Sequence, residues 1–167
     1  MFYFPPFYWI IKILPSNLLN IIFLTVDGMI RAKGICSLGV DNIRYGTFYG
    51  GIDNKLMNSS WVAILICGTL CGCGGGIFDS AFNISSPTWT FSTPKTFIKP
   101  TYDMKISFYI ALFYALTTSS DEYTVTKFTI PLFSINQGRV LAIIGMIVLN
   151  LAKMINLKGI KSKEKEI

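Results

Sequence analysis

Residues 67–84 read CGTLCGCGGGIFDSAFNI, and the glycines of this stretch decide which fold the chain can adopt. Five glycines and three cysteines lie within ten positions, directly after the apolar run WVAILI. In a soluble helix, each glycine costs about 1 kcal/mol relative to alanine. In a membrane, small residues allow helix backbones to approach closely, and such packing supports helix association there. The stretch therefore predicts a membrane helix that uses its glycines for packing or for a bend.

The composition of the whole chain also indicates a membrane protein. The 167 residues are 51% hydrophobic and only 14% charged, whereas soluble domains carry about 25% charged residues. The net charge is +6, and a basic balance in so apolar a chain favours anionic lipid as a partner over nucleic acid. No histidine is present, so no histidine-dependent catalytic triad can form. No enzyme activity and no nucleic-acid partner are expected.

The apolar runs predict an all-α membrane protein with four transmembrane helices plus a partial one, one of them kinked at glycines. A helix needs about 20 apolar residues to cross the hydrocarbon core, so the first run is only a partial span. The helical transmembrane domain covers residues 1–155, with spans at about 2–14 (partial), 16–35, 59–82, 103–118 and 139–155. Polar loops are expected at 41–58, 83–102 and 119–138. A lysine-rich tail at 156–167 follows, and its lysines predict a cytosolic C-terminus.

Two interpretations of the glycine stretch remain open at this point. Gly68, Gly72 and Gly76 recur every four residues and form a small-residue face that a neighbouring helix could contact. Gly74, Gly75 and Gly76 are consecutive, which favours a kink. Uncovered backbone survives in a membrane only inside protein or beside a water-filled cavity, where its carbonyl groups can face a cation. The spacing alone favours packing over a pore-lining bend.

Charged residues inside the apolar runs are candidate contacts for ions or lipid. Asp27 and Arg31 are four positions apart, which places them on one helix face. They are either an internal ion pair near the membrane boundary or a site for an ion or an anionic lipid head group. Lys105 and Arg139 are expected to extend towards the membrane interface.

The cysteines give a weaker signal. Cys67, Cys71 and Cys73 could ligate a metal, but no fourth ligand lies nearby. They are interpreted as small residues compatible with a membrane, and no metal site is expected.

The order of these features resembles the trimeric intracellular cation channels (TRIC channels). PPFYWIIKILP followed by IIFLTVDGMIRAKGICSLGV is similar to the end of the family's third helix and its fourth helix. WVAILICGTLCGCGGGIFDSAFN resembles the glycine-rich fifth helix, MKISFYIALFY the sixth and RVLAIIGMIVLNLAKMI the seventh. The resemblance implies a homotrimer with an ion pathway in each protomer. It also implies potassium conduction across the endoplasmic or sarcoplasmic reticulum membrane, or the nuclear envelope, which balances charge during calcium release.

The resemblance also assigns candidate site residues. It implies that Gly68, Gly72, Gly74, Gly75 and Gly76 form the kink and border the pore. The run GMIRAKGI matches the family's basic run, so Arg31, Lys33 and the neighbouring Asp27 become candidate lipid or ion contacts.

The chain departs from the family in two respects. Family members carry a lysine where this chain has Asp27, and the lysine–arginine pair is tied to phosphoinositide binding; the acidic residue here argues against a bound phosphoinositide, and no other cofactor is expected. The first two family helices and half of the third have no counterpart, so the chain corresponds to the C-terminal portion. The alternative function is a non-conducting membrane protein or channel fragment that packs through its glycines.

Overall fold

The computed structural model describes residues 15–45, 60–84, 87–88, 91, 99–118 and 132–163, with side chains described as far as residue 155. The helices are α2 (Ser16–Lys33), the π-helix η1 (Gly34–Asp41), α3 (Asn42–Tyr45), α5 (Trp61–Phe82), α7 (Tyr102–Thr117) and α8 (Ile135–Lys163). Within the described residues, the one β-type pairing is an isolated bridge between Thr118 and Phe133. The described part of the chain is therefore helical, as the sequence predicts. The partial span expected at 2–14 lies outside the described residues.

Polar side chains begin three of the helices. Ser60 accepts a hydrogen bond from the Ala63 amide at the start of α5, and Thr101 caps α7 in the same way. Before α8, the amide of Ser134 donates to Gln137 Oε1 at 3.1 Å, while the Gln137 amide donates to Ser134 Oγ at 3.4 Å. This reciprocal arrangement is a capping box, which satisfies two amides that a helix start leaves unpaired.

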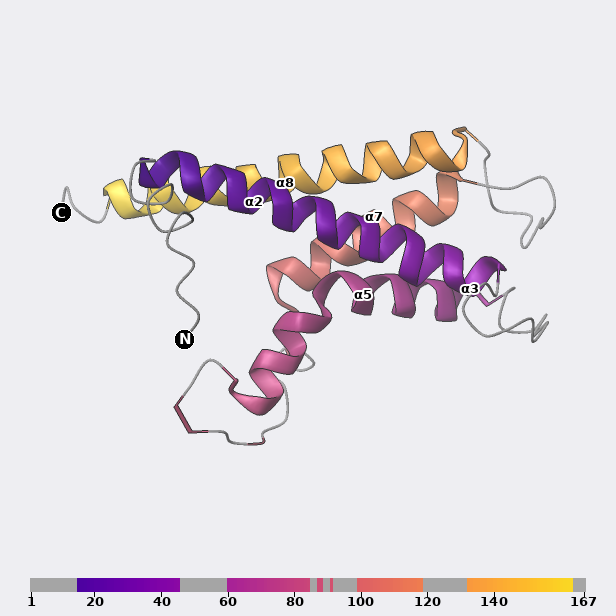
Figure 1. Ribbon diagram of the computed structural model, residues 1–167, viewed down its shortest axis with the longest axis horizontal. Coiled ribbons are helices and arrows are strands. Elements are labelled where there is room, and N and C mark those ends of the chain that lie inside the picture. The colour runs from indigo at the N-terminus through magenta and orange to yellow at the C-terminus, as the bar shows by residue number, and fades with distance from the viewer. Residues whose placement is uncertain are drawn as a thin grey trace, which may run out of the picture.

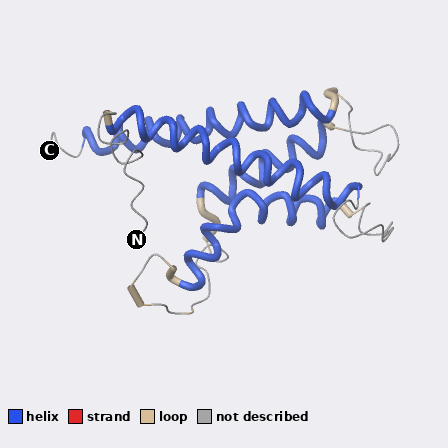
Figure 2. Tube along the Cα trace, in the orientation of Figure 1, coloured by secondary structure: helices blue, strands red, loops and turns tan. Residues whose placement is uncertain are grey.

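The helices pack in one bundle, in two groups (Figure 1). α2 packs along α8, while α5 packs against η1 and α7. α2, η1 and α3 follow one another without a break, so together they form one long helical segment. In Figures 1 and 2, α5 begins beside α3, and its second half then turns away from the direction of the first.

The long segment ends later than expected. The sequence predicted a loop from residue 41, whereas helical structure continues to Tyr45 and buries both Asp41 and Arg44. The reason is that Ile35, Val40 and Ile43 continue an apolar face into the core. The two charged side chains find partners on α7 and α8, as described below. At the other end of the chain, α8 extends past the predicted boundary at 155 to Lys163.

The outer faces of the helices are apolar. Large hydrophobic side chains such as Phe23 and Ile30 on α2, Val62 on α5, Tyr109 on α7 and Val148 on α8 are more than half exposed. Among the described residues, two helices are long and apolar enough to cross a membrane, Trp61–Phe82 and Ile135–Ile155. Lipid would cover such faces at no cost, and the number of spans beyond these two stays a prediction.

Candidate functional site

The first half of α5 is packed tightly through two of the predicted glycines. A Cβ atom at Gly68 would lie 2.9 Å from Ala111 Cβ on α7, and one at Gly72 would lie 2.6 Å from Ser107 Oγ and 2.7 Å from Ile35 Cδ1. All three distances are too short for a real Cβ contact, so glycine at both positions allows α7 and η1 to approach α5 this closely. Gly68 and Gly72 are thus packing residues within this chain.

Two glycines of η1 form the other side of this close contact. A Cβ at Gly39 would lie 2.5 Å from Gly68 Cα, and one at Gly34 would lie 3.2 Å from the carbonyl oxygen of Cys71. Their spacing in the sequence did not indicate a common surface, because residues five positions apart do not share a face of an α-helix. They share a face in a π-helix, whose hydrogen bonds join residues i and i+5. The spacing becomes meaningful only once the π-helix is known.

The three consecutive glycines that follow in α5 have no such neighbours. A Cβ added at Gly74, Gly75 or Gly76 would meet no atom within 4 Å. The three glycines therefore leave the backbone of α5 uncovered at these positions. The four-residue face predicted for Gly68, Gly72 and Gly76 is divided, since its first two members are packed and its third is open.

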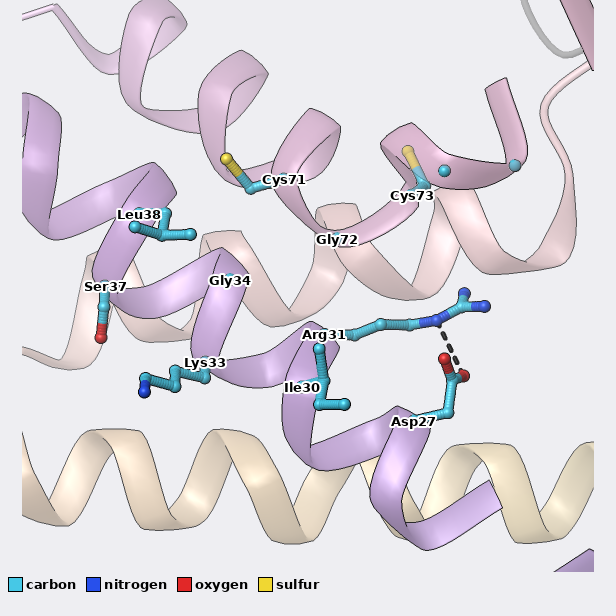
Figure 3. A pocket seen from close by; sticks show the side chains of 12 residues that line it. Asp27, Ile30, Arg31, Lys33, Gly34, Ser37, Leu38, Cys71, Gly72 and Cys73 are labelled. Carbon is cyan, nitrogen blue, oxygen red and sulfur yellow. Dashed lines mark ion pairs between the residues drawn. The ribbon is translucent and has the colours of Figure 1, made fainter. Parts of the chain in front are cut away.

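A hollow of about 660 Å³ lies between the open part of α5 and the α2–η1 segment. Gly72, Gly75 and Gly76 line it from α5, and Asp27, Arg31 and Lys33 line it from α2 (Figure 3). The structure thus brings three of the five predicted glycines and all three predicted charged residues to the same hollow. Gly68 and Gly74 are not among its lining residues.

The charged residues beside the hollow form a chain of ion pairs across three helices, which we call the open network. Arg31 Nε lies 2.8 Å from Asp27 Oδ2, and Arg31 Nη1 lies 3.5 Å from Asp103 Oδ2 on α7. Lys153 Nζ on α8 lies 2.8 Å from Asp103 Oδ1. All four side chains are between 30% and 49% exposed, so water or an ion can reach them. The sequence predicted the Asp27–Arg31 pair and missed its two distant partners.

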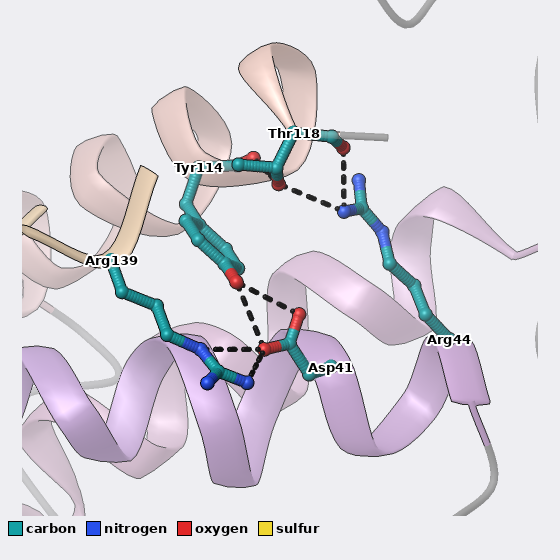
Figure 4. Close-up of polar contacts among 5 residues, drawn as sticks. All are labelled: Asp41, Arg44, Tyr114, Thr118 and Arg139. Carbon is teal, nitrogen blue, oxygen red and sulfur yellow. Dashed lines mark hydrogen bonds and ion pairs between the residues drawn. The ribbon is translucent and has the colours of Figure 1, made fainter. Parts of the chain in front are cut away.

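A second network lies at the opposite end of α7 from Asp103, and we call it the closed network (Figure 4). Arg139 Nη2 lies 2.8 Å from Asp41 Oδ2, and Tyr114 Oη donates to the same carboxylate at 2.9 Å. Arg44 donates to the carbonyl oxygens of Thr118 and Ala115 at the end of α7, where a helix presents unpaired carbonyl groups. These contacts tie η1 and α3 to α7 and α8.

The closed network corrects the expected role of Arg139. The sequence predicted that this side chain extends to the membrane interface, but it turns inward to a carboxylate that is only 7% exposed. A buried carboxylate without a partner would be costly, and Arg139 provides that partner. Lys105 is exposed, and its extension towards the membrane interface stays a prediction.

The cysteines do not form a metal site in the described part of the chain. No group of three histidine, cysteine, aspartate or glutamate residues there is close enough to hold a metal ion. All four cysteines are free thiols, and the Cys73 thiol donates to the Thr69 carbonyl oxygen one turn earlier.

Apolar outer faces, helices joined through glycines, and a partly polar hollow beside an uncovered backbone together define an α-helical membrane protein with a candidate transport pathway. The family comparison agrees, since the TRIC channel family model matches residues 1–150. The chain therefore belongs to the TRIC channel family, which is a family of cation channels rather than of enzymes. Searches among curated proteins and among solved structures gave no match.

Proposed function

We propose that this chain conducts monovalent cations, potassium in particular, along the hollow between α2–η1 and α5. The observation that carries the proposal is that the hollow borders Gly75 and Gly76, where the α5 backbone has no side chain to cover it. Membership of the TRIC channel family supports the same function.

The uncovered backbone suits a cation pathway for a physical reason. Consecutive glycines weaken a helix, and we attribute the change of direction in α5 to Gly74, Gly75 and Gly76. α5 stays helical through these glycines, but each carbonyl oxygen has a second lone pair beyond its helical hydrogen bond, and no side chain covers it there. Such oxygens can replace part of the hydration shell of a potassium ion.

The positive charge of Arg31 does not oppose this function. Its guanidinium group contacts the carboxylates of both Asp27 and Asp103, and paired opposite charges largely cancel at a distance. For the same reason we do not propose a bound phosphoinositide, since Arg31 already has two acidic partners.

The remaining features of the proposal rest on family membership. We place the channel in the endoplasmic or sarcoplasmic reticulum membrane, as a homotrimer that supplies counter-ion current during calcium release. The exposed apolar faces of α2 and α7 offer surfaces that lipid or neighbouring protomers can cover.

The alternative function, helix packing without conduction, has less support. It required Gly68, Gly72 and Gly76 to be available to a partner. Gly68 and Gly72 instead contact α7 and η1 of the same chain, so they serve the internal packing of the protomer.

A bilayer recording tests the proposed function. The purified full chain, reconstituted in planar bilayers in potassium chloride, is expected to give potassium current, and Gly75→Leu with Gly76→Leu is expected to reduce the single-channel conductance several-fold. Val148→Leu on the outer face of α8 is the matched control, because Val148 is exposed there and lines no part of the hollow. Absence of current above background, or unchanged conductance in the leucine variant, would contradict the proposal.

A further inference from the structure

The open network contains an acidic residue on α7, Asp103, that does not line the larger hollow. We infer that Asp27 attracts cations into this hollow and that Asp103 makes this possible by neutralising Arg31 from behind. The inference rests on the proposed function and adds the residues that set its preference for cations over anions.

Asp27 is the acidic residue that the described part of the chain contributes to the larger hollow. Its side chain is 49% exposed, so a hydrated ion can reach it. Arg31 and Lys33 line the same hollow, and these two cations would favour anions if nothing compensated them. Lys33 is exposed, and in Figure 3 its side chain extends in the direction opposite to Arg31. The ion preference of the hollow near Asp27 therefore depends on how fully the charge of Arg31 is cancelled.

A second hollow behind the first supplies that compensation. It has a volume of about 270 Å³ and is lined by Asp27, Arg31, Asp103 and Lys153, among others. Asp27 and Arg31 line both hollows. These two residues therefore form the wall between them. In Figure 3, the two side chains meet at one edge of the larger hollow.

The order of charges determines which sign reaches the larger hollow. The network alternates from Lys153 to Asp103, then Arg31, then Asp27, with contacts of 2.8, 3.5 and 2.8 Å. The negative charge of Asp103 partly cancels the positive charge of Arg31, so Arg31 repels cations in the larger hollow less strongly. Asp27 is the terminal member of the chain, and it retains negative charge on the side that faces the larger hollow.

Removing either carboxylate should change ion preference by a measurable factor. A unit charge a few ångströms from an ion, in partly aqueous surroundings, alters its occupancy about five- to tenfold. We expect Asp27→Asn to lower the potassium-to-chloride permeability ratio about fivefold, and Asp103→Asn to lower it about twofold because Asp103 acts through Arg31. Asp27→Glu keeps the negative charge and should retain most of the native permeability ratio. The double variant Asp27→Asn with Arg31→Gln should have a ratio closer to that of the native chain than Asp27→Asn alone.

The experiment measures reversal potentials of the reconstituted full chain under a potassium chloride gradient. Asp79→Asn is the matched control, because Asp79 is an exposed carboxylate on α5 that lines neither hollow, and its ratio should not change. Current with unchanged ratios in the Asp27 and Asp103 variants would overturn the inference while leaving the proposed function intact.

If the native chain gives no current, the proposed function is overturned. A binding measurement then tests the inference about Asp27 separately. Thallium(I), a monovalent cation close in size to potassium, is titrated into the detergent-solubilised chain and followed by thallium NMR. Weaker binding to the Asp27→Asn variant than to the native chain and the Asp79→Asn control supports the inference. Equal binding to all three overturns it.

Discussion

The two ends of the bundle each contain a network of charges, but they differ in what surrounds it. In the closed network, Asp41 is 7% exposed and its partner Arg139 comes from a helix 98 residues further along the chain. In the open network, every member is at least 30% exposed and two hollows adjoin it. α5 follows the same division, since its first half is packed at Gly68 and Gly72 while Gly74–Gly76 face open space. The difference indicates that one end of the protomer holds the helices together and the other is available to ions.

The largest expected effect comes from breaking the central ion pair at each end. Arg139→Gln removes the cationic partner of the buried Asp41 carboxylate and leaves it the hydroxyl of Tyr114, so we expect a loss of about 3 kcal/mol of stability. Arg31→Gln is the matched variant at the open end and should cost less than about 1 kcal/mol, because its partners are exposed to solvent. Thermal unfolding in detergent, followed by size-exclusion chromatography, measures both. Equal losses would remove the distinction between the two networks.

The next effect comes from adding a methyl group to glycines in the two regions. Gly39→Ala places a Cβ against the backbone of Gly68, and since backbone cannot move aside easily we expect a loss of about 1–3 kcal/mol. Gly75→Ala meets no neighbouring atom and gains helix propensity, so it should raise stability by up to about 1 kcal/mol. The same unfolding assay compares them, and a destabilised Gly75→Ala variant would show that the open half of α5 is packed after all.

A smaller effect is expected at the boundary between the two halves of α5. Ser107 Oγ is buried and has no hydrogen-bond partner in the described part of the chain, so Ser107→Ala should raise stability by about 1 kcal/mol. The same change should relieve part of the clash that Gly72→Ala creates, because Ser107 Oγ is one of the two groups that the new Cβ would meet. Non-additive unfolding energies in the double variant would establish the contact. Strict additivity would contradict it.

The smallest effect concerns thiol access rather than stability. Cys71 is exposed and lines the larger hollow, whereas Cys36 is 1% exposed in the core. A small water-soluble maleimide should therefore label Cys71 in the reconstituted chain and leave Cys36 unmodified. Mass spectrometry of the labelled peptides gives the site, and labelling of Cys36 under native conditions would contradict the burial of η1.

The sequence predicts the bounds of two helices closely and the contacts between helices poorly. The apolar runs place α5 and α7 within two residues of their observed bounds, because each run is long and ends in polar residues. The Asp27–Arg31 pair could be predicted from its spacing on one helix. The Asp41–Arg139 pair could not, because nothing in the pattern of one helix specifies a partner on another. The contact between Gly39 and Gly68 was also missed, since it depends on the wider turn of η1.

The division of the glycines was only partly predictable. The recurrence of Gly68, Gly72 and Gly76 correctly indicated close packing at its first two positions. It could not show that the packing neighbours Ala111 and Ile35 end there and that the third position is open. That outcome depends on where α7 and η1 lie relative to α5.

Cysteine accessibility at the open half of α5 tests the central claim most directly. In a chain whose native cysteines are replaced by serine, Gly75→Cys places a thiol beside the hollow, and Val62→Cys places one on the exposed outer face of the packed half. A cationic methanethiosulfonate reagent should abolish most of the potassium current of the Gly75→Cys channel and leave that of the Val62→Cys channel unchanged. If residue 75 reacts and the current persists, or if it is inaccessible to the reagent, the ion pathway does not pass beside these glycines.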